Sequence, residues 1–494
     1  MKATIISRVM LLVLCLAMIA GLASCGNNGG TSLPSNGNGN NEQTTTPPVA
    51  ELSPIDTLPN DVTYNYEDFT ILLRNGSEHI ADIAVEKLTS ESSSVEKAVY
   101  ERNLDIQEHF QVNFVFVTTA VSDFKATVNK AVQTGDHLYD VIAGDGRTVF
   151  DGVIAGYYAD WNDLEYIDLD GDWWSQSARK EWATPAGKLF AMNGDLSYMS
   201  IGNNAAMFFN KSILNDAGIT SPYTHAYANT WTMETFSQIV KQVDANLNHD
   251  DTNAIESDSF GYATQQWRGP IYATFSAGIG SLVKNGDGKY EIGFKNETIY
   301  NVVDTYLDLV FDSDAAYYGT NLSKIRNAFA SGNVVFTDDN VKCAVSFKGS
   351  GIDFGIVPIP KATEDVEYSS LVGSGTNTFA VLKTLKSADL SRASLMLEAM
   401  ACYGHEDVIP YYYDTILSYQ AMQDEDSLEM LKIIRNAGFF DLGHYTTFGS
   451  IADITKLIID NPGTYGENIY TAIAVLEGKT LAELEVWYYL DQMQ

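Results

Sequence analysis

The segment VNFVFVTTAVSDFKATVNKAVQTGDHLYDVIAGDGR, residues 112–147, alternates strand and helix signals and ends in a glycine loop. Val112 to Val117 and Tyr139 to Ala143 are short runs rich in β-branched and aromatic residues, which predicts two strands. Residues 122 to 134 between these runs predict a helix. The segment therefore predicts a strand–helix–strand unit of the kind that builds parallel sheets.

The same alternation starts further upstream, where Phe69 to Leu73 predicts a strand and residues 94 to 109 predict a helix. The resulting βαβαβ order predicts an α/β fold with a parallel sheet. Ligands of such sheets bind beyond the carboxyl ends of the strands. The loop of residues 144–147 follows a strand directly, so we expect Asp145 and Arg147 to bind a ligand.

The rest of the chain continues the pattern and is long enough for two domains, since about 430 residues follow the N-terminal segments. Further strands are expected at Gly187 to Phe190, Ala205 to Phe209 and Val334 to Phe336. Thr232 can cap one helix, and Leu322, Ile325 and Phe329 form one face of another. A capping box of Thr480 and Glu483 predicts the start of a last helix.

The N-terminus has the pattern of a secretory signal. Lys2 and Arg8 precede an uncharged run from Val9 to Ala23, which is short for a membrane span. The run ends in Leu-Ala-Ser-Cys, which resembles a lipoprotein lipobox and implies a signal peptide over residues 1–24 and lipidation of Cys25. Ordinary signal cleavage, with Cys25 left as a spare thiol, is the alternative.

Residues 25–63 are rich in Gly, Asn, Ser, Thr and Pro, which predicts a disordered tether after the lipidated cysteine. We therefore expect the folded body to lie on the extracytoplasmic face of the cell membrane, held there through a lipid anchor only. The formal net charge of −34 excludes nucleic acid as a partner and also supports solubility. Of four cysteines, Cys343 and Cys402 remain in the folded part, so no disulfide framework is expected, although one bridge between them stays open.

Several segments in order resemble the family 1 extracellular solute-binding proteins, the group that includes maltose-binding protein. The matching segments are Tyr139-Asp140-Val141-Ile142, Asp160-Trp161-Asn162-Asp163-Leu164, Trp173-Trp174, Gly187-Lys188-Leu189-Phe190-Ala191, Phe209-Asn210-Lys211, Thr230-Trp231-Thr232, Phe329-Ala330-Ser331-Gly332, Phe354 to Lys361, and Tyr411-Tyr412-Tyr413-Asp414. The resemblance covers nearly the whole folded part.

The resemblance implies a two-lobe periplasmic-binding-protein-like fold of type II, with a ligand cleft between lobes joined by crossing strands. By analogy, the N-terminal lobe takes residues 64–200 and 369–410, and the C-terminal lobe takes residues 201–368 and 411–494. It also implies a monomeric receptor of an ABC importer that closes on a small-molecule ligand, in this group a mono- or oligosaccharide, and delivers it to the transmembrane permease subunits.

Sugar receptors pair flat aromatic rings with polar partners at the ring edges. Trp267 and Arg268 lie together in a Gly/Pro loop, which is poor core material, and we expect them to bind ligand. Trp173, Trp174 and Tyr198 are further candidates for the cleft. For each of these aromatic residues, a place in the core or on the surface is the alternative.

Metal and cofactor sites are not expected. Asn246, Asn248 and Asp250 alternate as in a calcium loop, but no glycine follows for the sharp turn and Ser257 stands where a closing carboxylate is needed. This segment is either a weak candidate for a metal site or a polar loop.

An enzyme is the competing class, since a secreted acidic protein could be a glycoside hydrolase with two carboxylates about 5 to 9 Å apart. With 64 acidic residues some close pair is expected by chance, and hydrolase, zinc and phosphate-loop motifs are absent from the sequence. We therefore expect a binding protein. Peptides or other neutral polar solutes, and a sensor role in place of transport, stay open. A strongly anionic ligand would need a cationic pocket, and the sequence has few clustered Arg or Lys residues.

Overall fold

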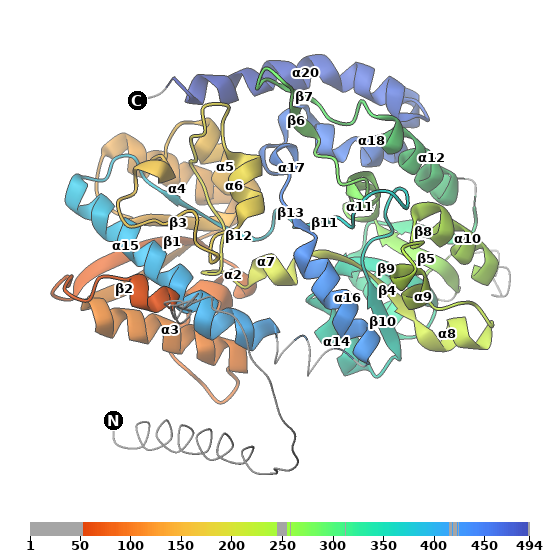
Figure 1. Ribbon diagram of the computed structural model, residues 1–494, viewed down its shortest axis with the longest axis horizontal. Helices are drawn as coiled ribbons and strands as arrows, with labels where there is room; N and C mark the ends of the chain where they lie inside the picture. Colours follow the sequence, from red (N-terminus) through yellow and green to blue (C-terminus); the bar gives the residue numbers. More distant parts are fainter. Residues whose placement is uncertain are drawn as a thin grey trace, which may run out of the picture. The chain divides into compact units, whose positions relative to one another are not determined.

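The structure, a computed structural model, describes residues 53–244, 254–256, 258–311, 313–413, 417, 422 and 424–492. These residues belong to one compact unit that starts at Leu52. Two separate β-sheets, each with its own helices, form the framework of this unit (Figure 1). The expected α/β fold class with two lobes is confirmed.

The first sheet has four strands in the order β12-β3-β1-β2. β1 (Glu67–Arg74) pairs in parallel with β2 (Val112–Thr119) and with β3 (Val141–Asp145), whereas β12 (Asn377–Val381) is antiparallel to β3. Residues 141–144 and all of β12 are buried, because helices cover both faces of the sheet. The predicted parallel βαβαβ unit is therefore confirmed, and the chain returns to it much later through β12.

Helices on opposite sides of the first sheet come from its crossovers and from the later chain (Figure 1). They are α3 (Ser94–Phe110) and α15 (Ser387–Tyr403) on one side and α4 (Val121–Thr134) and α5 (Gly146–Ile154) on the other, with the shorter α2 (Ser77–Ile83) and α6 (Gln176–Trp182) nearby. α3 begins with a capping box, in which Ser93 Oγ accepts from the backbone N–H of Glu96 and the Glu96 carboxylate accepts from that of Ser93.

The second sheet has five strands in the order β10-β4-β9-β5-β8. The strands are β4 (Ala205–Asn210), β5 (Phe260–Gln265), β8 (Ala316–Gly319), β9 (Val334–Asn340) and β10 (Phe354–Val357). β5 runs parallel to β8 and β9, and β4 is antiparallel to β9 and β10. The helices around it are α8 (Lys211–Asp216), α9 (Pro222–Tyr227), α10 (Met233–Asp244), α11 (Gly269–Phe275), α12 (Glu297–Phe311), α13 (Leu322–Ala330), α14 (Cys343–Ser350) and α16 (Glu425–Asn436).

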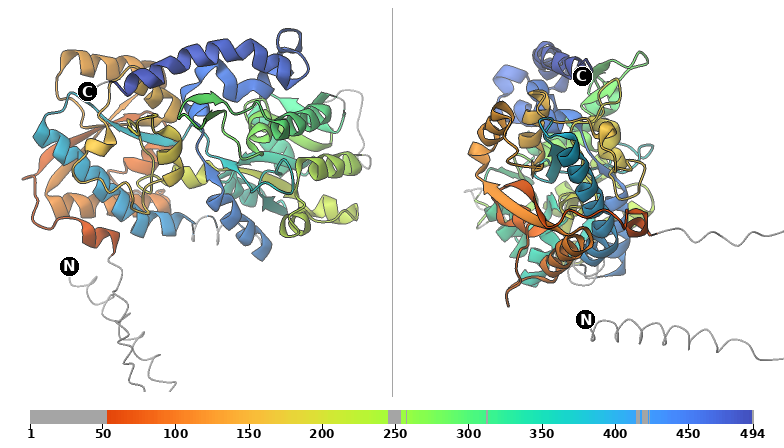
Figure 2. Two further views of the ribbon diagram at one scale, coloured as in Figure 1. Left: turned by 45° about the horizontal axis from the view of Figure 1, so that its top comes forward. Right: turned by 90° about the vertical axis from the view of Figure 1, so that its left-hand side faces the viewer.

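Short elements lie between the two sheets (Figure 1). They are α7 (Met199–Gly202) and the parallel pair β11 (Ser370–Leu371) and β13 (Gly438–Phe439). Beyond β13 the chain forms α17 (Leu442–Thr446), α18 (Ile454–Asp460), α19 (Pro462–Tyr465) and α20 (Ile469–Leu490), and a hairpin of β6 (Leu282–Lys284) and β7 (Tyr290–Ile292) lies near them. α20 packs against α5 and α12, so it contacts helices of both lobes (Figure 2).

Two local predictions are wrong. Residues 187–190 form no strand, because Leu189 bonds to the turn at Trp161: its carbonyl accepts from the Trp161 N–H at 2.7 Å. The helix predicted to open at Thr480 is the second half of α20. Thr480 Oγ1 donates within that helix to the Leu476 carbonyl at 2.9 Å, and the Glu483 carboxylate accepts from the backbone N–H of Gly449.

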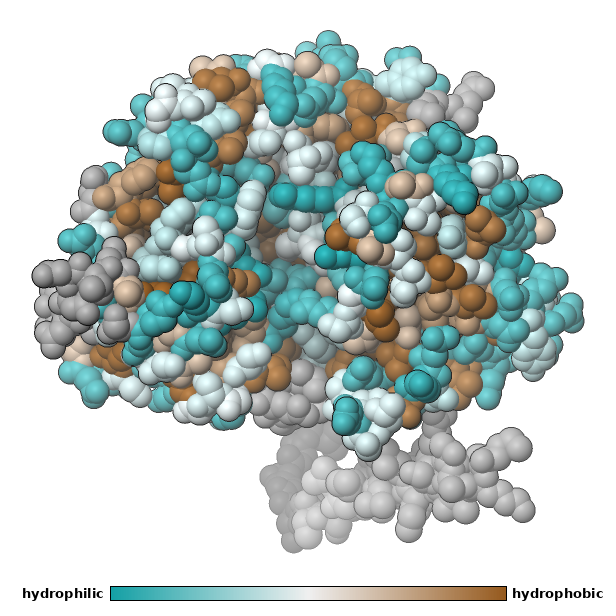
Figure 3. Space-filling view, turned by 180° about the vertical axis from the view of Figure 1, so that it is seen from behind, coloured by the Kyte–Doolittle hydropathy of each residue, from teal (hydrophilic) through white to brown (hydrophobic). Residues whose placement is uncertain are grey.

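The lobe boundaries stay a prediction, and the signal peptide, Cys25 and most of the tether lie outside the described residues. Cys343 and Cys402 are buried free thiols, so the bridge left open above is not formed. Among the described residues, no helix combines the length and apolar character that crossing a bilayer requires. The face seen in Figure 3 mixes hydrophilic residues with smaller groups of hydrophobic ones.

Candidate functional site

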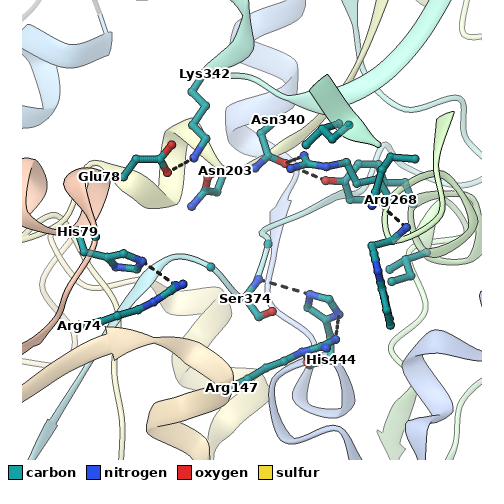
Figure 4. Close-up of a pocket in the computed structure, with 18 of the residues that line it drawn as sticks. Arg74, Glu78, His79, Arg147, Asn203, Arg268, Asn340, Lys342, Ser374 and His444 are labelled. Atoms are coloured by element: carbon teal, nitrogen blue, oxygen red, sulfur yellow. Dashed lines mark hydrogen bonds and ion pairs between the residues drawn. The ribbon is translucent and has the colours of Figure 1, made fainter. Parts of the chain in front are cut away.

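A cavity of about 610 Å³ opens at the carboxyl ends of strands from both sheets. Arg74 is the last residue of β1, Gln265 the last of β5 and Asn340 the last of β9, and all three line it. Its wall is mainly polar and includes Arg74, Glu78, His79, Arg147, Asn203, Gln265, Trp267, Arg268, Tyr272, Asn340, Lys342, Ser374 and His444. Ligands of such sheets bind beyond the carboxyl ends of the strands, and here the strand ends of both lobes face the same cavity (Figure 4).

The wall on the side of the first sheet is organised by Arg74. Its Nη1 donates to Nε2 of His79 at 2.9 Å and lies 3.5 Å from a carboxylate oxygen of Asp145. His79 Nδ1 lies 2.6 Å from Oδ1 of Asn377, and burial lowers the pKa of His79. The imidazole of His79 is therefore neutral at pH 7, and its Nε2 accepts the hydrogen bond from the Arg74 guanidinium.

Asp145 and Arg147 lie where the strand-end argument puts them, but they differ in role. Asp145 caps α5, since its carboxylate accepts from N and Oγ1 of Thr148 at 3.2 and 2.6 Å, and its contact with the site runs through Arg74. Arg147 lines the cavity. Its Nε donates to the His444 carbonyl at 3.0 Å, and Nη2 lies 3.5 Å from Asp453.

His444 is held in the wall by the N-cap of α17, where Asp441 accepts from the His444 N–H at 2.7 Å. Burial, together with the neighbouring Arg147, lowers the pKa of His444 well below its ordinary value. This side chain is therefore neutral at pH 7. It adds a hydrogen-bonding group to the cavity and leaves the positive charge to the arginine.

Arg268 supplies the charge of the opposite wall. Its Nη1 donates to Asp339 at 2.6 Å and to Oδ1 of Asn340 at 2.8 Å. Burial by itself raises the pKa of Asp339, but Arg268 and Arg326, which both bind this carboxylate, hold it below its ordinary value. The fully buried Asp339 therefore stays charged and fixes Arg268 in place.

Trp267 stands beside Arg268 with 49% of its surface exposed, and it lines the cavity. Lys456 Nζ lies 4.0 Å from the ring centroid, a cation–π contact that holds the indole against α18. A half-exposed tryptophan in a polar wall can offer its free surface to the apolar face of a ligand. The structure brings together Trp267, Arg268 and Arg147 of the predicted set.

One ion pair crosses the site. Lys342 follows β9 of the second sheet, and Glu78 lies in α2, which follows β1 of the first sheet. The Lys342 ammonium group binds the Glu78 carboxylate (Figure 4). Asn340 Nδ2 donates to Oδ1 of Asn203 in the connecting segment at 3.1 Å. The two lobes are thus in direct contact at one edge of the cavity.

The other predicted aromatic residues do not line this cavity. Trp173 and Trp174 are buried at 8% and 1% exposure, and their Nε1 atoms donate to the buried Glu398 at 2.8 and 3.0 Å. Both indoles are part of the buried core, and neither offers an exposed ring to this cavity. Tyr198 stacks on Tyr412 with ring centroids 4.6 Å apart, beside a smaller neighbouring cavity.

Several wall residues were missed by the sequence reasoning, namely Arg74, Glu78, His79, Asn203, Asn340, Lys342 and His444. One of them had a usable signal, since Arg74 directly follows the predicted strand Phe69 to Leu73. Applying the strand-end rule to that strand would have found Arg74, whereas the predicted strand Val334 to Phe336 stops short of Asn340, where β9 ends.

Metal binding has no support in the part of the chain that the structure describes, where no group of three or more His, Cys, Asp or Glu side chains could hold an ion. The weak candidate loop with Asn246, Asn248 and Asp250 lies outside the described residues.

The sequence matches no protein-family model and no curated protein. Its structure is similar to the GacH receptor of Streptomyces glaucescens, solved unliganded and with acarbose (16% identity, TM-score 0.53, 86% of this chain and 99% of that one). It is also similar to the cyclic alpha-maltosyl-1,6-maltose binding protein of Arthrobacter globiformis (14%, 0.58, 85% and 99%) and to UgpB of Mycobacterium tuberculosis in complex with glycerophosphocholine (13%, 0.55, 85% and 98%). The chain therefore has the two-lobe α/β fold of the ABC-transporter solute-binding proteins.

Proposed function

We propose that this protein is the extracytoplasmic receptor of an ABC importer for a carbohydrate, a mono- or oligosaccharide, and that it has no catalytic activity of its own. The observation that carries the proposal is the cavity between the strand ends of both sheets. Its volume of about 610 Å³ falls within the range of small-molecule sites. Both lobes contribute to its wall, as a receptor that closes on its ligand requires.

The chemistry of the wall supports a sugar. Amide, hydroxyl and guanidinium groups provide both donors and acceptors for hydroxyl groups, and Trp267 provides an exposed ring for the C–H face of a pyranose. The similar GacH and Arthrobacter globiformis proteins are named for, or solved with, acarbose and a cyclic maltose derivative. UgpB, solved with glycerophosphocholine, supports a different polar solute as the second candidate.

The N-terminal sequence supports the cellular part of the proposal. In the proposed arrangement, Cys25 carries the lipid and residues 26–63 tether the folded body to the membrane. The monomeric body delivers its ligand to the permease subunits. Incorporation of a labelled fatty acid into the chain, lost in Cys25→Ser, would be expected from this assignment. Labelling that persists in the variant would contradict it.

A ligand screen tests the receptor role. The purified full chain is heated with mono- and oligosaccharides, and with peptides and glycerophosphodiesters for comparison. A ligand at a hundredfold excess over its Kd adds about 2.7 kcal/mol to the free energy of unfolding and raises the unfolding temperature. A rise with one sugar class is the expected result. A rise with peptides or glycerophosphodiesters alone would contradict the sugar assignment.

Substitution of the exposed ring tests the site itself. Trp267→Ala should weaken sugar binding roughly 30-fold, the equivalent of about 2 kcal/mol for a buried aromatic contact, in a titration calorimeter. Tyr489→Ala removes an aromatic ring of 61% exposure from α20, outside the cavity wall, and is the matched control. Equal affinity of the two variants would place the ligand elsewhere.

A further inference from the structure

The charge of the cavity wall is opposite to that of the chain. The formal net charge of the whole sequence is −34, yet the wall carries one carboxylate, Glu78, and four cations. The cations are Arg74, Arg147, Arg268 and Lys342, and Figure 4 shows them around the cavity. These four residues come from separate segments of the chain, so their proximity follows from the fold. A strongly anionic ligand needs a cationic pocket, and the few clustered Arg and Lys residues of the sequence did not indicate one.

Two of the four cations are neutralised by direct partners. Arg268 donates to the buried Asp339 at 2.6 Å, and Lys342 binds Glu78. A ligand would compete with a charged carboxylate for either of them. Arg268 shapes the wall, Lys342 links the two lobes, and neither requires a charged ligand.

Arg74 and Arg147 are different, because their ion pairs are longer than the 2.6 Å contact between Arg268 and Asp339. Asp145 lies 3.5 Å from Arg74 and Asp453 lies 3.5 Å from Arg147, beyond a good charge-assisted hydrogen bond. Their shorter contacts are to neutral acceptors, the His79 ring and the His444 carbonyl. Nε of Arg74 is buried without a hydrogen-bond partner. Both arginines line the cavity, and neither has a carboxylate closer than 3.5 Å.

We propose that the ligand is a carbohydrate bearing an oxyanion, a carboxylate or a sulfate or phosphate ester, which binds between Arg74 and Arg147. This inference rests on the proposed receptor function and specifies its substrate class. Two planar guanidinium groups match the paired oxygens of such an anion, which would form shorter contacts with them than the carboxylates of Asp145 and Asp453 at 3.5 Å. Trp267 on the opposite wall then packs against the sugar ring.

The arrangement also explains the two histidines. His79 and His444 each contact one of the arginines, and burial keeps both rings neutral. A protonated imidazole would repel the neighbouring guanidinium, whereas the neutral ring of His79 accepts a hydrogen bond from it. We assign both histidines as positioning residues for the arginines.

The test uses matched pairs of sugars on the full chain. Hexoses and their uronic acids, and disaccharides with and without a sulfate or a phosphate ester, are titrated by calorimetry at low and high salt. The acidic member of one pair should bind at least about tenfold more tightly than its neutral parent, and added salt should weaken its binding. Comparison of uronates, sulfates and phosphates identifies which oxyanion is bound.

Variants locate the anion. Arg74→Gln and Arg147→Gln should each weaken binding of the acidic sugar roughly 10- to 100-fold, the range of a charge-assisted hydrogen bond, with little change for the neutral parent. Lys432→Gln removes an exposed cation of α16 and is the control, since Lys432 is paired with Glu429 outside the cavity wall. Arg74→Lys and Arg147→Lys keep the charge and test whether the planar fork is needed, should a Gln variant fold poorly.

The outcomes separate the two proposals. Equal binding of neutral and acidic sugars, unaffected by the arginine variants, would overturn the oxyanion inference and leave the sugar receptor standing. Binding of inorganic sulfate, phosphate or acetate as tight as that of the acidic sugar would overturn the carbohydrate part. Absence of binding by every sugar to the folded chain would refute the receptor function, and the inference with it.

Discussion

Glu398 is a buried carboxylate whose charge should make the stability of this protein depend on pH. Its side chain is 3% exposed and accepts from Nε1 of Trp173 and Trp174, at 2.8 and 3.0 Å. Burial raises the pKa of Glu398 from 4.5 to about 7, because the indole hydrogen bonds do not fully replace the lost water. Glu398→Gln keeps the size of the side chain and removes the titration.

The direction and size follow from linkage. Between pH 4.5 and about 7 the folded state binds this proton more tightly than the unfolded state, so stability is highest at low pH and falls as the pH rises through this range. The full loss is about 3 kcal/mol, and the part lost between about pH 5.5 and about pH 8 is about 2 kcal/mol. Asp82, Asp338 and Asp441, each with a pKa raised to about 6 by burial, act in the same direction.

Urea unfolding at these two pH values, followed by circular dichroism, isolates the contribution of Glu398. The difference in unfolding free energy between the two pH values should be about 2 kcal/mol smaller in Glu398→Gln than in the unmodified chain. The contributions of the other titratable groups are the same in both proteins and cancel in this comparison. Glu429→Gln, which alters a 55% exposed carboxylate, should leave the difference unchanged. The reasoning is refuted if Glu398→Gln retains the full pH dependence.

Three further substitutions test local packing by the same unfolding measurement. Gly146→Ala should cost about 1–3 kcal/mol by overpacking, because a Cβ there would lie 2.2 Å from ring carbons of Tyr445; unchanged stability would contradict this contact. Asn468→Ala should cost about 1 kcal/mol by removing the cap of α20, and a neutral effect would mean that the helix starts elsewhere. Asp441→Ala leaves two donors of Ser281 unpaired and should cost about 3 kcal/mol or more, so a loss below about 1 kcal/mol would show that water replaces the carboxylate.

Elements with an unambiguous hydrophobic period could be predicted from the sequence. β1 extends the predicted strand Phe69 to Leu73 by a few residues at its ends, and α3 ends one residue beyond the predicted helix. The errors arise where tertiary contacts override a local signal. Thr480 and Glu483 have the pattern of a capping box, but the packing of α20 against helices of both lobes keeps the helix continuous through Thr480.

The site was only partly predictable for a different reason. Trp267 and Arg268 are adjacent in a loop, so their composition identifies them. Arg74 and Arg147 line the same cavity because β1 and β3 are neighbours in the sheet, a pairing that follows from topology and not from local sequence. Trp173 and Trp174 looked exposed because acidic residues precede them, but Glu398 from α15 accepts hydrogen bonds from both indoles in the core, and nothing near them in sequence indicates this partner.

The distribution of charge suggests how ligand binding and closure are coupled in the proposed receptor. The first lobe provides Arg74 and Arg147, the second provides Trp267, and Lys342 and Glu78 form an ion pair between the walls. A ligand can favour the closed form only through contacts that the open form lacks. An oxyanion held by one lobe gains the aromatic contact with the other only on closure. In this arrangement the arginines of the first lobe determine the affinity for the anion. The contact between the sugar ring and Trp267 of the second lobe provides the free energy that drives closure.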